Sequence, residues 1–142
     1  MDKLSQFVGD HMMLFASFVV ILVLLILDIV KDITKSFQYL QPADATALIN
    51  REDAVVLDIR SDKDFQSGHI LNAMHVPMGL LDSKINSLEK YKEKSVIVSC
   101  RSGQTSFNAC QLLAKNGFTK LYNLKGGMMA WENANLPLSK AK

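Results

Sequence analysis

Cys100 stands at the head of a short polar loop that follows an apolar run, in the segment SCRSGQTS at residues 99–106. If the next helix begins at Gln104 or Thr105, the backbone N–H groups of residues 101–105 can curl toward a common centre, where the helix dipole favours negative charge. Helix N-termini and neighbouring arginines favour the thiolate form of a cysteine, and Arg101 is adjacent. The segment therefore predicts a nucleophilic sulfur in a cradle of donors, able to hold a second sulfur or an oxyanion.

The cysteine also has a plainer interpretation, in which its side chain only fills space in a core. Free cysteines are among the most frequently buried residues, and a position at the end of a strand often serves packing alone. The residues around the loop centre are small or hydroxylic, namely Ser102, Gly103 and Ser106, so no bulky side chain blocks it. The loop by itself leaves a reactive cysteine and a packing cysteine equally open.

The elements that would position this loop are indicated by short apolar runs that alternate with helical patterns. Extended segments are expected at residues 37–40, 54–57, 74–76, 95–99 and 120–124. Helices are expected from Pro42, over 61–67, around 81–88, between the loop and Asn116, and over 128–135, with a polar break at 50–53. This alternation predicts an α/β fold with a parallel β-sheet flanked by helices on both faces. Ligands bind at the carboxyl ends of such strands, and Cys100 follows one of these ends.

The first thirty residues differ in composition from the rest of the chain. No charged residue occurs from Met12 to Leu27. Ile29 and Val30 extend the apolar stretch beyond Asp28 to about nineteen positions, near the ~20 that span a bilayer. A cleaved signal peptide would show small residues after a shorter apolar region, and a buried core helix would show a polar face. The segment shows neither feature.

This composition predicts one N-terminal transmembrane helix over about residues 12–30, within a membrane anchor of residues 1–35 that precedes a domain of residues 36–142. Cations on the two flanks set the orientation of such a helix. Lys31 and Lys35 follow the span, whereas one lysine and the terminal amine precede it. The bias favours the C-terminal domain inside, so we expect a single-pass protein of the cell inner membrane with a cytoplasmic domain.

The net charge and the cysteine content limit which classes of ligand and partner the chain is expected to bind. The formal net charge is +2, and Lys and Arg are interspersed with Asp and Glu, so no basic stripe for a nucleic-acid backbone is present. Cys100 and Cys110 have no second cysteine pair for a zinc site. His11 lies at the membrane edge, and His75 has no partner in view near Pro77. The sequence therefore predicts no nucleic acid, no metal and no cofactor.

Three separated stretches carry a family resemblance: VVLDIRSDKDFQSGHILNAMHVP, SCRSGQTS and NLKGGMMAWENANLPL. In their order, spacing and residue types they resemble the rhodanese-like domain family over about residues 37–138. With the anchor, the chain looks like a single-domain, membrane-anchored bacterial rhodanese-like sulfurtransferase. The resemblance implies a parallel α/β sandwich and a catalytic cysteine, here Cys100, that takes sulfane sulfur as a persulfide. It also implies that the active-site loop binds substrate with Arg101, Ser102, Gly103, Gln104 and Thr105.

The loop departs from the family pattern at one position. The six-residue loop of the family often ends in Arg, whereas this chain has Thr105 there and a cation at the second position, Arg101. A thiosulfate dianion would therefore meet one fixed charge fewer, although Thr105 offers a hydroxyl donor. The related phosphatase branch closes a longer loop with an Arg at the position of Ser106, so a phosphatase is not expected.

Four further residues are interpreted as structural. In the family, residues such as Asp58 and Arg60 anchor neighbouring loops through an ion pair, and His69 fits a hydrogen-bonded turn residue better than a base. Cys110 falls on an apolar helical stripe and is assigned to the core. A resolving thiol for Cys100 is the alternative role for Cys110.

Two functions stay open at this point. In the first, a rhodanese-type, thiosulfate:cyanide sulfurtransferase-like enzyme takes sulfane sulfur from a small donor such as thiosulfate or a persulfide. It passes that sulfur, through a Cys100 persulfide, to cyanide, a thiol or a protein acceptor. In the second, a non-catalytic membrane-tethered module uses the loop to bind a protein partner at the bilayer surface. Addition of one sulfur atom to Cys100 distinguishes the two.

Overall fold

The computed structural model describes residues 1–33 and 36–140, and the chain divides into two compact units, residues 1–35 and 36–142. Residues 34 and 35 lie outside the described residues. The sequence predicts a domain boundary after residue 35, and Lys35 was used to predict the orientation. Both predictions therefore involve a residue that the structure does not describe.

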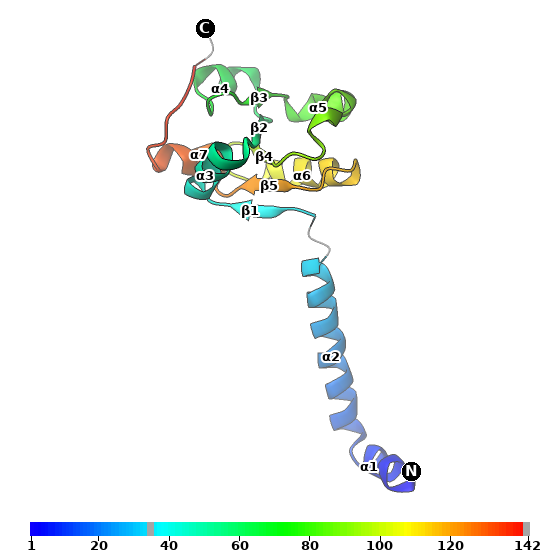
Figure 1. Ribbon diagram of the computed structural model, residues 1–142. Coiled ribbons are helices and arrows are strands. Elements are labelled where there is room, and N and C mark those ends of the chain that lie inside the picture. The colour runs from blue at the N-terminus through cyan, green and yellow to red at the C-terminus, as the bar shows by residue number, and fades with distance from the viewer. Residues whose placement is uncertain (34–35, 141–142) are drawn as a thin grey trace. The chain divides into compact units, whose positions relative to one another are not determined.

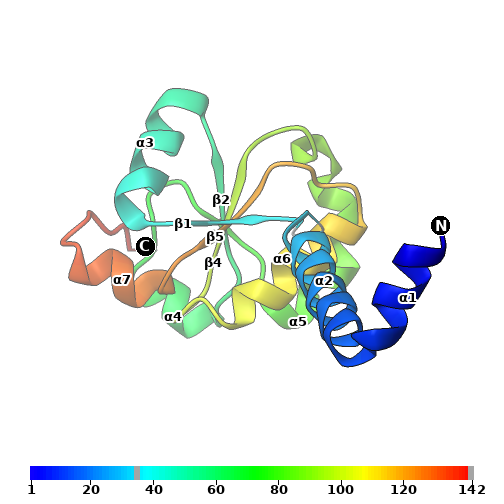
Figure 2. The same cartoon turned by 90° about the horizontal axis from the view of Figure 1, so that it is seen from below.

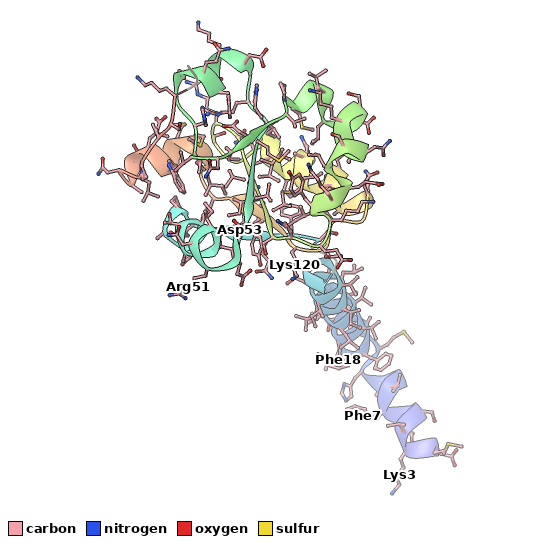
Figure 3. The ribbon with its side chains drawn as sticks, turned by 45° about the horizontal axis from the view of Figure 1, so that its top comes forward. Lys3, Phe7, Phe18, Arg51, Asp53 and Lys120 are labelled. Atoms are coloured by element: carbon pink, nitrogen blue, oxygen red, sulfur yellow. The ribbon has the colours of Figure 1, made fainter. Side chains whose placement is uncertain are left out.

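The first unit consists of helices α1 (Asp2–Asp10) and α2 (Met12–Ile33), shown in Figure 1. The part of α2 from Met12 to Val30 is long and apolar enough to cross a membrane by length and composition, and none of it is buried. The expected N-terminal apolar helix is thus confirmed, and its exposure is unlike that of a core helix. Helix α1 was not expected from the sequence. Side chains at the start of this unit, including Phe7 and Phe18 in Figure 3, project from the two helices.

The second unit is built on a parallel sheet of five strands, which confirms the predicted fold class. The strands are β1 (Gln38–Leu40), β2 (Val55–Asp58), β3 (Met74–His75), β4 (Val96–Ser99) and β5 (Leu121–Leu124). Their order across the sheet is β1-β5-β4-β2-β3, and every neighbouring pair is parallel. The central strand β4 is buried along its whole length, as its β-branched run predicts for a strand covered on both faces.

Helices cover both faces of this sheet, as Figure 2 shows. They are α3 (Pro42–Glu52), α4 (Asp62–Ser67), α5 (Met78–Lys84), the 3₁₀-helix η1 (Ile85–Tyr91), α6 (Thr105–Lys115) and α7 (Gly127–Asn133). Side chains of α5, η1 and α6 pack in one core with Val96 and Val98, whereas α3 and α7 pack in a second core with Ile97. The side chains of β4 thus alternate between the two cores, and the side chain of Cys100 lies in the core of α6.

Two helices differ from the sequence prediction. The polar residues 50–53 were expected to form a break, but α3 continues to Glu52 and ends at Asp53, which is labelled in Figure 3. Asp53 has a φ of 53°, and this left-handed conformation closes the helix. The helix expected around 81–88 is an α-helix followed by η1. Ile85, Leu88 and Tyr91 recur at every third residue, which is the spacing that places side chains on one face of a 3₁₀-helix.

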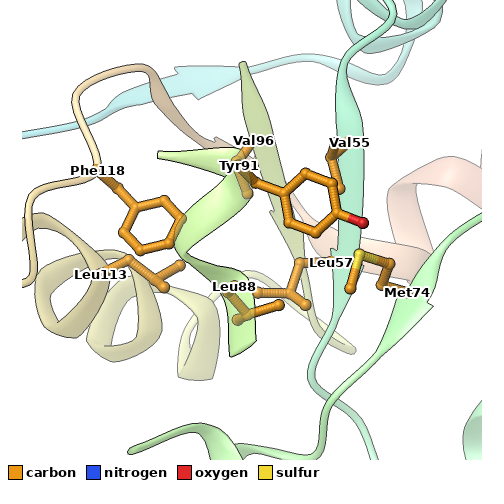
Figure 4. Close-up of a pocket in the computed structure, with 8 residues that line it drawn as sticks. All are labelled: Val55, Leu57, Met74, Leu88, Tyr91, Val96, Leu113 and Phe118. Atoms are coloured by element: carbon orange, nitrogen blue, oxygen red, sulfur yellow. The ribbon is translucent and has the colours of Figure 1, made fainter. Parts of the chain in front are cut away.

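One pocket of the second unit lies inside the core of α6, and its lining includes the first residues of β2 and β4. Figure 4 shows its apolar lining, to which Val55, Val96, Leu88, Tyr91 and Phe118 contribute. Its volume is about 10 Å³, close to the smallest space that holds one water molecule. A pocket of this size with an apolar lining is a packing gap and not a substrate site.

Candidate active site

Cys100 lies directly after β4, at the carboxyl edge of the sheet, and is 4% exposed. Its Sγ accepts hydrogen bonds from the backbone N–H of Gly103 at 3.0 Å and of Ser106 at 3.4 Å. Gly103 has a φ of +91°, a conformation that glycine adopts without strain and that turns the loop back over the sulfur. The sequence predicted donors from residues 101–105, so Ser106 lies one residue beyond the expected cradle. Because α6 begins at Thr105, the N–H of Ser106 belongs to its first turn and has no partner within the helix.

Two buried side chains behind the sulfur were not predicted as site residues. The Cys100 Sγ donates to Ser106 Oγ at 3.3 Å, and Ser106 Oγ donates to Asn123 Oδ1 at 2.5 Å. Asn123 Nδ2 in turn donates to the carbonyl of Gly103 at 3.1 Å. Asn123 and Ser106 are both fully buried. The available signal for Asn123 was a single amide within the otherwise apolar strand segment LYNL.

The start of α7 holds the loop from another side. The backbone N–H of Met128 donates to the Cys100 carbonyl at 2.8 Å, and that of Met129 donates to the Arg101 carbonyl at 3.1 Å. Gly126 and Gly127 precede these donors with φ values of +74° and +58°. The loop is therefore fixed by β5 through side chains and by α7 through backbone atoms.

The remaining loop residues predicted to bind substrate face outward. Arg101, Ser102, Gln104 and Thr105 are exposed. Arg101 borders a cleft of about 220 Å³, which is also lined by residues of α7 and by residues in and around α4: Arg60, Asp64, Ser67, Met128, Met129 and Glu132. The cleft thus lies beside the Cys100 loop, and its lining contains both cationic and carboxylate side chains.

The predicted pair of Asp58 and Arg60 lies at the end of β2, beside this cleft. Arg60 Nη2 contacts Asp58 Oδ2 at 2.8 Å, and Nη2 also donates to the carbonyl of Gly68 at 2.6 Å. The backbone N–H of Arg60 donates to Asp58 Oδ1 at 3.0 Å. Asp58 is fully buried, and these bonds link the end of β2 to the residue that follows α4.

Both histidines of the first stretch have partners. His69 Nδ1 lies 2.8 Å from the Phe65 carbonyl oxygen, and its ring stacks on that of Phe65 at 3.8 Å between centroids. His75 was expected to have no partner, which is wrong. Its Nε2 lies 2.8 Å from the Arg60 carbonyl oxygen, and its ring stacks on Phe65 at 4.3 Å. The partners come from α4 and the residues before it, which sequence spacing alone did not place beside β3.

Cys110 lies deeper in the core than Cys100 does. It is fully buried on α6, and its Sγ lies 3.9 Å from the Tyr122 carbonyl oxygen. Burial, and to a lesser extent the charge of a Cys100 thiolate, raise the pKa of Cys110 to about 12. The sulfur of Cys110 therefore stays protonated at neutral pH, which fits a core residue better than a resolving thiol.

Native alkylation should separate the two cysteines. With excess iodoacetamide at about pH 8, we expect Cys100 to be modified and Cys110 to be spared, because only thiolates react at useful rates. Trypsin places the two in different peptides, residues 95–101 and 102–115, so mass spectrometry reads each one separately. After unfolding in guanidinium, both should react. Equal native rates would contradict the burial and raised pKa of Cys110.

Similarity to known proteins agrees with this geometry. Residues 41–134 match the family described as Rhodanese-like domain. The chain is 36% identical over 143 residues to the Escherichia coli protein named uncharacterized protein YibN, with 100% of both chains covered. It is 34% identical over 91 residues to an Allochromatium vinosum protein named sulfurtransferase, covering 64% of this chain and 83% of that one.

A solved structure shows the same fold. The crystal structure of a rhodanese-related protein from Thermoplasma volcanium superposes with a TM-score of 0.67 at 26% identity, covering 73% of this chain and 99% of the other. The domain match includes the Cys100 loop, the Asp58–Arg60 pair and the Gly126–Gly127 turn. The chain belongs to the rhodanese-like domain family.

Proposed function

We propose that the chain is a rhodanese-type sulfurtransferase in which Cys100 carries the transferred sulfur. The observation that supports this most is the pair of backbone N–H donors directed at Cys100 Sγ, because such donors stabilise negative charge on sulfur. The Allochromatium vinosum relative, which is named sulfurtransferase, supports the same activity. Gly103 and Ser106 supply these donors, and the rest of the loop forms the outer wall of the site.

The reaction has two displacement steps. The Cys100 thiolate attacks the sulfane sulfur of a donor, an S–S bond forms at Sγ, and the remainder of the donor leaves with the electron pair of the broken bond. For thiosulfate the leaving group is sulfite. In the second step a cyanide or a thiolate acceptor attacks the outer sulfur, and Cys100 leaves as a thiolate. Both steps pass negative charge through Sγ, where the two N–H groups lie.

The loop charges bear on which donor is preferred. Arg101 is an exposed cation at the cleft, and Thr105 supplies no second one. Arg60 also lines the cleft, but it is paired with the buried carboxylate of Asp58. Asp64 and Glu132 add carboxylates to the same cleft. We therefore propose that a persulfide donor, with less charge than the thiosulfate dianion, loads Cys100 more efficiently than thiosulfate does.

The test is the mass of the full-length chain in detergent after incubation with a persulfide donor or with thiosulfate. We expect a gain of one sulfur atom per chain, removed again by cyanide. Blocking the persulfide with an alkylating reagent and digesting with trypsin should place the extra sulfur in the peptide of residues 95–101. Absence of a gain with every donor would reject sulfur transfer.

A second candidate function is docking of a protein partner without catalysis. It is favoured by one observation, the 4% exposure of Cys100, which leaves little of the side chain open to a donor. Photo-crosslinking from Arg101 in membranes distinguishes the two. Partner capture that is unchanged by Cys100→Ser, with no sulfur gain in the wild type, would favour docking.

We also propose that residues 1–35 anchor the domain of residues 36–142 to the cell inner membrane through α2, as a single-pass protein with the domain in the cytoplasm. The length and apolar composition of α2 support the anchor, and the flanking cations support the orientation. Protease added to intact spheroplasts should leave the domain undigested. Digestion from outside would reverse the orientation.

A further inference from the structure

The hydrogen bonds behind the sulfur form a continuous chain whose direction can be assigned. Asn123 contacts the carbonyl oxygen of Gly103 with one end of its side-chain amide and the hydroxyl of Ser106 with the other. A backbone carbonyl only accepts, so the amide nitrogen faces Gly103 and the amide oxygen faces Ser106. The orientation of the buried amide is therefore fixed by its partners.

The position of the Ser106 proton follows from this orientation. The hydroxyl has a single proton, and Asn123 Oδ1, at 2.5 Å, can only accept it. Toward Cys100, the hydroxyl then presents lone pairs, so the 3.3 Å contact is an S–H group donating to Ser106 Oγ. An amide oxygen takes up no proton at neutral pH, so the chain orients protons but does not relay them.

We propose that Asn123 is a positioning residue that restrains the reactivity of Cys100 by holding the Ser106 hydroxyl proton away from the sulfur. In this arrangement the side chains of Ser106 and Asn123 favour the neutral thiol of Cys100. The backbone N–H groups of Gly103 and Ser106 favour the thiolate. When the sulfur ionises, the hydroxyl has to leave Asn123 in order to donate to it. The buried Oδ1 of Asn123 then loses that donor, which opposes ionisation.

The effect on catalysis differs between the two steps. In the persulfide the negative charge lies on the outer sulfur, so the Ser106 hydroxyl can return to Asn123. When an acceptor removes the outer sulfur, Cys100 must leave as a thiolate and the hydroxyl has to turn again. Asn123 thus favours retention of the carried sulfur over its release. This consequence rests on the proposed sulfur transfer, whereas the direction of the hydrogen bonds does not.

The S–H stretching band in the infrared spectrum of the full-length protein in detergent tests the direction. In Asn123→Leu, which is close in size and lacks both polar atoms, the Ser106 hydroxyl is free to turn. We expect the Cys100 band to move to higher frequency, because the S–H group loses its acceptor. Asn123→Asp keeps an oxygen that accepts from Ser106 in either protonation state and should leave the band in place. The Cys110 band, assigned with Cys110→Ala, serves as an internal control.

The alkylation rate of Cys100 at neutral pH tests the restraint. Asn123→Leu should raise the rate about threefold to tenfold, the effect of one net hydrogen bond. The increase should be absent in a Ser106→Ala background, because Asn123 acts through that hydroxyl.

An unchanged band and rate in Asn123→Leu, or the same increase in both backgrounds, would overturn the proposal. If Asn123→Leu does not fold, Ser106→Ala alone must raise the frequency of the Cys100 band, and an unmoved band overturns the proposal. Neither readout requires sulfur transfer, so failure of that activity remains distinguishable.

Discussion

The Cys100→Ser variant is expected to gain no sulfur from any donor, whereas Cys110→Ala should load about one sulfur atom per chain, as the wild type does. A serine at position 100 places an oxygen where Gly103 and Ser106 donate their N–H groups, so the loop keeps its hydrogen bonds. The hydroxyl is not ionised at neutral pH and does not attack a sulfane sulfur. The loss is therefore chemical and not structural.

Intact mass after incubation with the persulfide donor measures this loss, and thiocyanate formation from cyanide measures turnover. The fluorescence of Trp131 serves as the folding control, because it is the only tryptophan of the chain and is buried in α7, the helix whose start is bonded to the loop. Retention of the sulfur gain in Cys100→Ser, with its loss in Cys110→Ala, would move the carrier to Cys110. Loss in both variants with native fluorescence would contradict a single carrier at Cys100.

The location of Cys100 could be predicted from the sequence because it depends on local pattern. The run from Val96 to Ser99 is short, apolar and β-branched, which marks a buried parallel strand, and the small residues after it indicate a loop before a helix. The carboxyl edge of a parallel sheet is where ligands bind, whatever the strand order. These facts place the cysteine without knowledge of its neighbours in space.

The residues behind the sulfur could not be predicted because they depend on strand pairing. Asn123 reaches the loop only because β5 pairs with β4 in a register that sets Val98 opposite Asn123. A pattern of apolar residues indicates that β5 is a strand but does not give its neighbour or its register. The partners of His75 were missed for a similar reason, since Arg60 and Phe65 are distant from β3 in the sequence and are brought to it by the fold.

Alanine in place of Gly127 is expected to lower the free energy of unfolding by about 3 kcal/mol and to reduce sulfur loading at Cys100 at least about tenfold. Gly127 has a φ of +58°, where a Cβ is unfavourable. That Cβ would also lie 2.7 Å from the carbonyl carbon and oxygen of Arg101, and closer still to the Cys100 carbonyl oxygen.

These contacts cannot be relieved by moving a flexible side chain, because they involve backbone atoms. The same two carbonyls accept hydrogen bonds from Met128 and Met129. Displacing α7 to make room therefore breaks the bonds that fix the loop, and displacing the loop moves the N–H groups away from Cys100 Sγ. Either response changes the site as well as the stability.

Gly79→Ala is the matched control for this prediction. Gly79 lies within α5, and its Cβ would meet no heavy atom within 4 Å. Alanine there should stabilise the helix by roughly 0.5–1 kcal/mol and leave sulfur loading unchanged. Urea unfolding of the full-length chain in detergent, followed by Trp131 fluorescence, compares the two variants in one experiment. If Gly127→Ala unfolds and loads sulfur as Gly79→Ala does, then the close approach of α7 is not what holds the Cys100 loop in place.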